Sequence, residues 1–446
     1  MDLQPAHELL QQACRRGATA ADVLMVDNVV LDVQVRLGTV EKLQQARRQR
    51  LGLRLFFGQR SAVTATSDFS LASLSQLLED TCALAQAMAA DPCAGLPDPE
   101  VLSATVPDLD LWDEALAGMT VEDGITMARE AEQAALDFDP CITNSEGGTF
   151  STTQAHVAYL NSYGFVGQYR ACSAYLSVVP VASSHGSMQR DSWYTAARKR
   201  AHLQAPVAVG QEAARRALRR LEARKVATQK VPVVFDPRTA SSLLGHVCAA
   251  VSGAALYRRA SFLLDQLDET IAPEGFTVID DGTLPAALGS KPFDGEGVPT
   301  RRTTVVAAGV LRSYLLDTYS ARKLGLQSTG NAVRSAGEAP QVGPTNFYLM
   351  PGPYTPEEII ASVPRGLYVT ELLGFGVNLV TGDYSRGAAG LWIENGTLTH
   401  AVEEITIAGN LRQILADVEM IGNDLDWRRK VTAPTLKVRT MMLAGA

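Results

Sequence analysis

Histidine is the side chain that most often binds a catalytic metal ion, and this sequence contains six histidines. No two of them lie within five residues of each other: His7, His156, His185, His202, His246 and His400. The pattern H-E-x-x-H, which places two imidazoles on one helix face with a glutamate beside the first, is therefore absent. The local sequence predicts no zinc-binding helix and leaves open only a site assembled from distant residues.

Motifs for nucleophilic catalysis are also missing. The sequence has no G-x-S-x-G turn to present a serine and no phosphate-binding P-loop. The residues of a Ser-His-Asp triad meet only in the folded protein, so the sequence alone does not refute one. The six cysteines form no C-x-x-C pair, which favours free thiols in a reducing compartment. They are Cys14, Cys82, Cys93, Cys141, Cys172 and Cys248.

The segment 381–390 has an unusual composition that suits ligand binding. Its small residues let a bound backbone approach closely, while Asp383, Tyr384 and Arg386 supply polar groups. An equally good interpretation is a tight loop that an internal Asp383–Arg386 ion pair holds together. The sequence leaves these two interpretations open.

The composition indicates an ordinary globular protein of two or three domains, with 446 residues, 46% hydrophobic and 20% charged. The formal net charge is −8 and the basic residues are spread along the chain, which disfavours a nucleic-acid binder. No stretch approaches the roughly 20 apolar residues that span a bilayer, and the N-terminus lacks a signal-peptide core. We therefore expect a cytoplasmic protein with no nucleic-acid or membrane partner.

Hydrophobic periodicity predicts two α+β parts in the first half of the chain. In residues 1–108 we expect an α+β domain whose helices cover 3–16 and 70–90 and whose strands cover 22–26, 29–37, 51–57 and 61–66. Residues 109–228 form a middle α+β region packed with the first. Its expected elements are a helix capped by Thr120 and Asp123, strands over 155–161 and 164–179, and a helix over 209–224.

Residues 229–446 favour a β-rich C-terminal domain. A strand over 231–235 and a helix over 238–257 come first, and further strands cover 367–372, 388–394 and 397–402. Asn395-Gly396 joins the last two as a hairpin, because a type I′ turn needs positive φ at both positions. The predicted fold class is α+β: a mixed α/β N-terminal region followed by a β-rich C-terminal domain. The buried helix side is expected to carry Leu243, Leu244, Val247, Val251 and Leu256.

Several segments resemble the modulator-of-gyrase family of two-subunit bacterial proteases, the TldD and TldE (PmbA) proteins. The matching segments keep their order along the chain: 142–148 (ITNSEGG), 319–330 (YSARKLGLQSTG), 381–390 with 392–396, and 404–411 (EITIAGNL). Segments 91–95 and 291–297 also fit. The matches extend over most of the chain, and the resemblance is therefore specific.

The resemblance also distinguishes between the two subunits. The catalytic TldD subunit carries an H-E-x-x-x-H helix that binds a metal, with a further cysteine ligand nearer the C-terminus. In the matching helix here, Gly245 and Ala250 occupy the histidine positions and His246 occupies the glutamate position. A register that starts at His246 fails as well, and no cysteine follows Cys248. Glycine and alanine side chains have no ligand atoms, so no metal site is expected in this chain.

The resemblance therefore implies a TldE/PmbA-type subunit that lacks the metal motif. Such a subunit belongs to a cytoplasmic complex that cleaves unfolded or leader peptides, with zinc or another divalent metal in its TldD-like catalytic partner. This chain would need no cofactor and would line the substrate channel, for which the candidates are His246, Asp383, Tyr384 and Arg386. A homodimer in isolation is an alternative assembly. An independent hydrolase with an unrecognised site around His246, Cys248 or Arg386, and a peptide-binding or assembly protein without proteolytic role, are the alternative functions.

Overall fold

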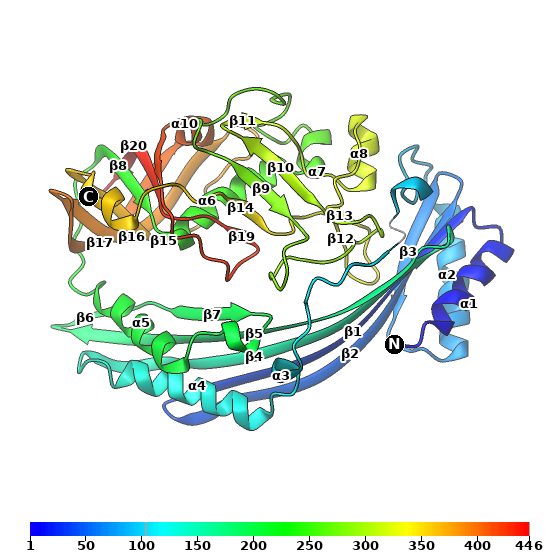
Figure 1. Ribbon diagram of the computed structural model, residues 1–446, viewed down its shortest axis with the longest axis horizontal. Coiled ribbons are helices and arrows are strands. Elements are labelled where there is room, and N and C mark those ends of the chain that lie inside the picture. The colour runs from blue at the N-terminus through cyan, green and yellow to red at the C-terminus, as the bar shows by residue number, and fades with distance from the viewer. Residues whose placement is uncertain (103–104, 446) are drawn as a thin grey trace.

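The computed structural model describes residues 1–102 and 105–445, which form two bodies facing each other (Figure 1). The first is a long curved β-sheet from the N-terminal half of the chain, and the second is a β-rich body from residues 229–445. The β-rich body lies over the concave side of the curved sheet. This architecture confirms the predicted α+β class, with a mixed N-terminal region followed by a β-rich C-terminal domain.

Seven strands form the curved sheet in the order β3-β2-β1-β4-β5-β6, and β7 pairs with β5. Their bounds are β1 Ala20–Arg36, β2 Thr39–Phe57, β3 Arg60–Thr66, β4 Ile142–Asn161, β5 Val166–Ser184, β6 Ser187–Arg190 and β7 Trp193–Ala197. Antiparallel pairing places Val26 of β1 opposite Val157 of β4. One continuous sheet therefore runs through both of the first two predicted parts.

Several of these strands are much longer than predicted. The expected strands 22–26 and 29–37 are a single strand, β1, and β2 extends back to Thr39 through a charged stretch. Nearly all of residues 39–50 are exposed, so their side chains give no hydrophobic pattern. Strand β4 starts at Ile142 and not at residue 155, although much of its added part is buried, and two register shifts there interrupt the regular alternation. The prediction of a short strand is wrong for residues 39–50 because backbone pairing, and not burial, holds this segment in the sheet.

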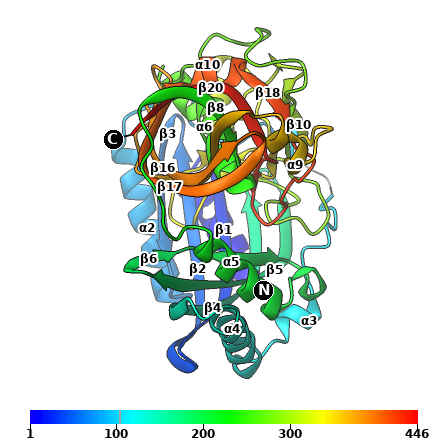
Figure 2. The ribbon, with the colours of Figure 1, turned by 90° about the vertical axis from the view of Figure 1, so that its left-hand side faces the viewer.

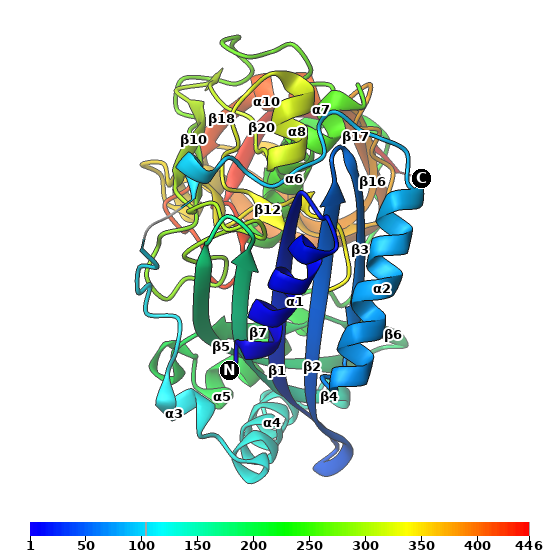
Figure 3. The same ribbon diagram turned by 90° about the vertical axis from the view of Figure 1, so that its right-hand side faces the viewer.

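Helices cover the convex face of the curved sheet (Figures 1 and 3). They are α1 Gln4–Arg15, α2 Leu71–Ala87, the short α3 Glu114–Ala117, α4 Val121–Leu136 and α5 Pro206–Leu218. The first two confirm the predicted helices, and Ser70 caps α2. Thr120 and Asp123 form the predicted capping box of α4, whereas α5 ends six residues before the predicted residue 224. The concave face remains available to the β-rich body.

The main sheet of the β-rich body has the order β17-β16-β15-β8-β20-β18. Its strands are β8 Gln229–Phe235, β15 Arg365–Leu373, β16 Asp383–Glu394, β17 Thr397–Asn410, β18 Val418–Ile421 and β20 Leu436–Ala444. An additional pairing of β17 with β20 closes the sheet on itself, and Figure 2 shows β8, β16, β17 and β20 curving around α6 Pro237–Ala250. Asn395 and Gly396 have φ values of 50° and 74°, which confirms the predicted hairpin turn.

The remaining elements of the β-rich body form a second, five-stranded sheet and short helices. That sheet has the order β11-β10-β9-β14-β19, and β12 pairs with β13. The bounds are β9 Val278–Asp281, β10 Arg302–Ala307, β11 Val310–Leu311, β12 Ala332–Val333, β13 Gln341–Val342, β14 Phe347–Leu349, β19 Val431–Thr432, α7 Gly253–Tyr257, α8 Thr318–Leu324, α9 Pro356–Ala361 and α10 Leu411–Ala416.

The helix predicted over 238–257 is interrupted at Ser252, which separates α6 from α7. At this point the backbone forms a parallel bridge to Leu315, with Gly253 N–H donating to the Leu315 carbonyl over 2.8 Å. This hydrogen bond to a segment distant in sequence replaces the hydrogen bond that the Gly253 N–H would make within a continuous helix. The prediction of one continuous helix is therefore wrong for a tertiary reason that periodicity does not reveal.

Candidate functional site

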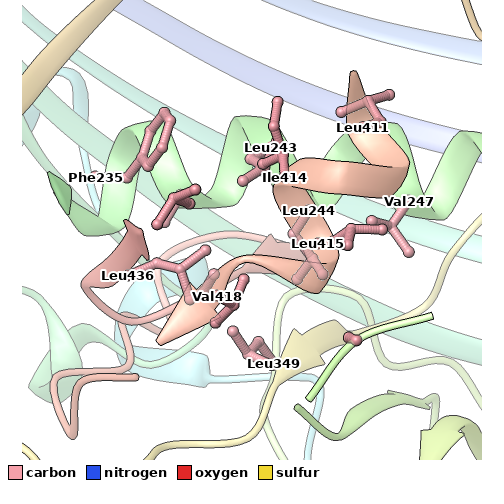
Figure 4. Packing of buried hydrophobic residues seen from close by; sticks show 14 of the residues in the cluster. Phe235, Leu243, Leu244, Val247, Leu349, Leu411, Ile414, Leu415, Val418 and Leu436 are labelled. Carbon is pink, nitrogen blue, oxygen red and sulfur yellow. The ribbon is translucent and has the colours of Figure 1, made fainter. Parts of the chain in front are cut away.

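Helix α6 is anchored on one side by the core of the β-rich body. Asp236 caps its first turn by accepting a hydrogen bond of 2.9 Å from the Thr239 N–H, and Pro237 opens the helix. The predicted buried residues are all buried, and Figure 4 shows Leu243, Leu244 and Val247 packed against residues from other elements. With this side held, the opposite side of α6 has a fixed position facing the curved sheet.

The positions that match the metal motif do not fit a metal ion. Gly245 faces open space, since a Cβ atom placed there would meet nothing within 4 Å. Ala250 is completely buried in the core, and His246 alone offers a ligand atom. Among residues 1–102 and 105–445, no group of three or more His, Cys, Asp or Glu side chains could hold a metal ion. The residues at these positions therefore do not form a metal site.

The environment of His246 consists of an aromatic ring and a cation. Its ring makes an edge-to-face contact with Tyr384, with centroids 6.0 Å apart and planes at 75°. The Nε2 atom of His246 and the hydroxyl of Tyr384 are both buried, and neither has a hydrogen-bond partner among the described residues. Buried polar atoms normally have partners, so these two atoms are exceptions to the usual pairing.

Burial and the nearby charge also affect the protonation of these two groups. Burial, assisted by the Arg386 guanidinium, lowers the pKa of His246 below its ordinary value. Burial raises the pKa of Tyr384 to about 12, against a smaller opposing effect of Arg386. Near pH 7 the imidazole is therefore neutral and the phenol keeps its proton. Together they offer one hydrogen-bond donor on the phenol and a neutral imidazole that can donate or accept.

The other candidates from segment 381–390 divide between two faces of a strand. The segment belongs largely to β16, so of the two interpretations the tight loop is wrong. Alternation along the strand places Tyr384 and Arg386 on one face and Asp383 on the other. Asp383 accepts hydrogen bonds from the Thr381 hydroxyl (2.6 Å) and the Asn410 amide (3.3 Å). Arg386 Nε donates to the Leu373 carbonyl over 3.1 Å, so both side chains have partners other than each other.

Two hollows run along the free side of α6. The first, of about 640 Å³, is lined by Thr239 and Ser242 of α6 and by four arginines, Arg238, Arg386, Arg428 and Arg429. Tyr175 of β5 and Tyr194 of β7 also line it, so it lies between the two bodies. The second, of about 560 Å³, continues past Gly245 and Ala249 and is mainly apolar. We call the two hollows together the α6 groove.

Sequence reasoning identified part of this groove. The structure brings His246, Tyr384 and Arg386 together, but of these three only Arg386 lines a hollow, and Asp383 lies outside. Arg428 and Arg429 were not among the predicted site residues. The run Trp427-Arg428-Arg429-Lys430 is a local basic cluster, and this signal could have identified them. Arg428 lies over the Trp193 ring, 4.2 Å from its centroid, and Arg429 donates to the Tyr194 hydroxyl.

Cys248, the other nucleophile considered, is a buried core residue of α6. Burial, with a further effect of Asp280, raises the pKa of its thiol far above the ordinary value. A thiol without access to its thiolate form is a poor nucleophile.

No helix among the described residues is long and apolar enough to cross a membrane.

Comparison with known families assigns each part of the chain. The PmbA/TldA metallopeptidase domain 1 matches residues 21–85, the central domain of that family matches 114–221, and its C-terminal domain matches 228–445. The chain is 38% identical to the metalloprotease PmbA of Escherichia coli O157:H7 over 425 residues, which are 95% of this chain and 92% of that protein. It is 34% identical to a metalloprotease PmbA homolog of Haemophilus influenzae, over 100% of this chain and 96% of that protein.

Solved structures share the whole architecture. A protein from Bacteroides thetaiotaomicron described as a modulator of DNA gyrase superposes with a TM-score of 0.92 at 29% identity, covering 99% of this chain and 98% of that one. TldE from Thermococcus kodakarensis has the same fold, with a TM-score of 0.88 at 20% identity, covering 99% of this chain and 100% of that one.

Proposed function

This chain belongs to the PmbA/TldA metallopeptidase family, and we propose that within it the chain acts as the metal-less, TldE/PmbA-type subunit of a cytoplasmic two-subunit protease. The complex cleaves unfolded or leader peptides. The zinc or other divalent metal and the general base belong to a TldD-like catalytic partner. This chain supplies no cofactor and no catalytic residue of its own.

The observation that carries this proposal is the composition of α6. Its two histidine positions hold Gly245, which faces open space, and Ala250, which is buried in the core. Neither side chain has a ligand atom, and a metal needs three or four protein ligands to be retained. The architecture of the family without these ligands supports a division of roles in which a partner provides them.

The contribution of this chain to cleavage is the α6 groove. Arg386 keeps its two terminal nitrogens free of any hydrogen bond or ion pair to the described residues, so they can donate to a peptide carbonyl or carboxylate. His246 and Tyr384 lie near Arg386 and have buried polar atoms without partners among the described residues, but they line neither hollow. The first hollow lies between the two bodies, and a flexible peptide can enter such a site more readily than a folded protein.

The alternative of an independent hydrolase receives less support from the geometry. Cys248 is buried with a raised pKa, and His246 has no hydrogen bond to a serine, threonine or cysteine among the described residues. A peptide-binding protein without a proteolytic role has the same groove and is separated from our proposal by activity. We therefore keep it as an outcome of the experiment below.

The test combines this chain with the TldD-like protein of the same organism and follows the cleavage of an unstructured peptide. We expect no cleavage by this chain alone and cleavage by the pair. Arg386→Ala should lower the rate of the pair by about tenfold or more, the effect of losing one charge-assisted hydrogen bond. Assembly and thermal stability should stay nearly unchanged.

Ser385→Ala is the matched control, because Ser385 is exposed on the opposite face of the same strand. Its rate should equal that of the unaltered pair. Cleavage by the purified chain alone would contradict the subunit role. Cleavage by the partner that is indifferent to this chain would favour the peptide-binding alternative, and loss of stability in Arg386→Ala with a normal rate per assembled complex would make Arg386 structural.

A further inference from the structure

A separate cavity lies where the concave face of the curved sheet meets the β-rich body. Its volume is about 570 Å³, within the usual range for small-ligand sites. Strands β1 and β2 form one wall, and the segment around residues 332–336 forms another. The walls approach closely at Gly52, where an added Cβ atom would lie 2.6 Å from the Gly337 nitrogen. We call it the seam cavity.

Four cationic side chains line the seam cavity, and two of them have no partner. Arg48 and Arg50 alternate on β2, so both point to the same side of the strand. Among the residues that the structure describes, neither guanidinium makes a hydrogen bond or an ion pair. The other two cations are Lys291 and Arg334.

Arg334 is the buried member of this set and is only partly satisfied. Its side chain is completely buried, and Nη1 donates to Asp22 over 2.8 Å. Its Nε and Nη2 atoms have no partner within the described part of the chain. A buried guanidinium with unused donors is costly unless something accepts those hydrogen bonds.

The nearby carboxylates are occupied elsewhere. Asp22 also accepts from Arg54 (2.9 Å), and Glu296 accepts from Arg54 (3.3 Å) and from the Thr318 N–H (3.0 Å). Asp294, the only acidic residue on the cavity wall among those described, accepts from three backbone N–H groups. No carboxylate is therefore left to neutralise Arg48 and Arg50.

The rest of the lining is mainly apolar, with Asn28 and Ser335 as its uncharged polar residues. Leu24 and Val26 of β1 and Val157 of β4 form a smooth floor on the sheet, and Tyr169 and Phe293 add two aromatic rings. These rings meet edge-to-face, with centroids 5.4 Å apart, across the junction of the two bodies. A cavity with a cationic side and an apolar aromatic side matches a ligand that has both characters.

We propose that the seam cavity binds an organic anion, a carboxylate carried on an apolar body of about the size of a phenylalanine side chain. Arg48, Arg50 and the free donors of Arg334 hold the carboxylate. The apolar body packs on the β1 floor, against the paired rings of Tyr169 and Phe293. This site is distinct from the α6 groove and does not depend on any role of the chain in proteolysis.

The test uses the full chain and isothermal titration calorimetry with 4-phenylbutyrate, which combines a carboxylate with a phenyl group. We expect saturable binding of one molecule per chain. The neutral analogue 4-phenylbutyramide should bind at least about tenfold more weakly, because it cannot make charge-assisted hydrogen bonds. Inorganic phosphate, which lacks the apolar body, should also bind more weakly.

The variant Arg48→Gln with Arg50→Gln should weaken 4-phenylbutyrate binding by at least about tenfold. Both side chains lack partners, so folding should be unaffected, and thermal unfolding checks this. The control, Lys42→Gln with Arg47→Gln, removes two charges from the same strand but outside the cavity. It should bind as the unaltered chain does. No saturable binding, or equal binding by the Arg48/Arg50 variant, overturns the proposal.

The same chemistry occurs in free carboxylic acids and in the C-terminal residue of a peptide. Competition with the tetrapeptide Ala-Ala-Ala-Phe, as free acid and as amide, separates these sources. Displacement of 4-phenylbutyrate by the acid but not by the amide identifies a peptide C-terminus as the ligand. Absence of competition by either peptide identifies a free small acid. Displacement by both forms alike overturns the role of the carboxylate.

Discussion

The first hollow of the α6 groove and the seam cavity both lie between the two bodies, yet their charges are held differently. In the groove, Arg386 donates to a backbone carbonyl, and the nearby His246 and Tyr384 are neutral, with buried polar atoms that have no partner among the described residues. At the seam cavity, Arg54 and Arg334 share the buried Asp22. Burial opposes the ionisation of Asp22, but Arg334 and Arg54 hold its pKa below the ordinary value. The Asp22–Arg334 ion pair therefore joins the two bodies beside the seam cavity, whereas Arg386 in the groove forms no ion pair with any described residue.

The largest expected effect comes from removing the shared anion of the seam. Asp22→Ala leaves Arg54 and Arg334 buried without their common partner, which should lower the free energy of unfolding by about 3–5 kcal/mol. Urea unfolding followed by circular dichroism measures this. The control is Asp27→Ala on the same strand, whose ion pair with Arg47 is exposed, and its loss should be much smaller. Equal losses of unfolding free energy in the two variants would show that the buried Asp22 ion pairs stabilise the chain no more than the exposed Asp27 ion pair does.

Two glycine substitutions compare how tightly the backbone is packed beside the seam cavity and in the α6 groove. Gly52→Ala at the seam forces the segment at Gly337 to move and should cost about 1–3 kcal/mol. Gly245→Ala in the groove meets open space inside a helix and should stabilise the chain by about 0.5–1 kcal/mol. Thermal unfolding of both variants checks these opposite signs. A destabilising Gly245→Ala would mean that the groove is packed as tightly as the seam.

A smaller effect is expected in the titration of His246. Its pKa is lowered in the folded chain, so the neutral form is favoured there and stability falls as pH drops below about 6.5. Arg386→Ala should move this pKa upward, because one of its two causes disappears. The imidazole resonances in nuclear magnetic resonance spectra report the shift. An unchanged pKa would place the Arg386 guanidinium away from the ring.

The last prediction is that the purified chain retains no stoichiometric zinc. After dialysis, elemental analysis of the purified chain should find well under one zinc per chain, because Gly245 and Ala250 offer no ligand atoms. One tightly bound zinc that is lost on substitution of His246 or His400 would overturn the proposed division of roles between the subunits. Soaking in excess zinc before dialysis controls for metal lost during purification.

Local sequence signals predicted the parts of the molecule that burial and turn chemistry determine. The Asn395-Gly396 hairpin and the buried side of α6 follow from positive φ and from periodicity, and both are present. The charged half of β2 was missed because its side chains are exposed and only strand pairing orders it. The break at Ser252 was missed because it depends on Leu315, which periodicity does not connect to it.

The candidate sites show the same limit. His246 and Arg386 could be singled out by residue type and by the family resemblance. Their companions in the groove, and the whole of the seam cavity, come from segments that are far apart in sequence and meet only through the fold. Arg48 and Arg50 occupy an ordinary charged stretch of the sequence, and nothing local distinguishes them from Arg47.

The closed sheet of the β-rich body has a consequence for how the chain folds. Val233 of β8 pairs with Leu367 of β15 on one side and with Val438 of β20 on the other. A strand that waits for partners so far along the chain gives the domain a high contact order, and high contact order slows folding. During synthesis β8 emerges long before both neighbours, with its edges unpaired, and is then exposed to mispairing and aggregation. We expect this body to depend on chaperones more than the curved sheet, whose strands mostly pair with near neighbours in sequence.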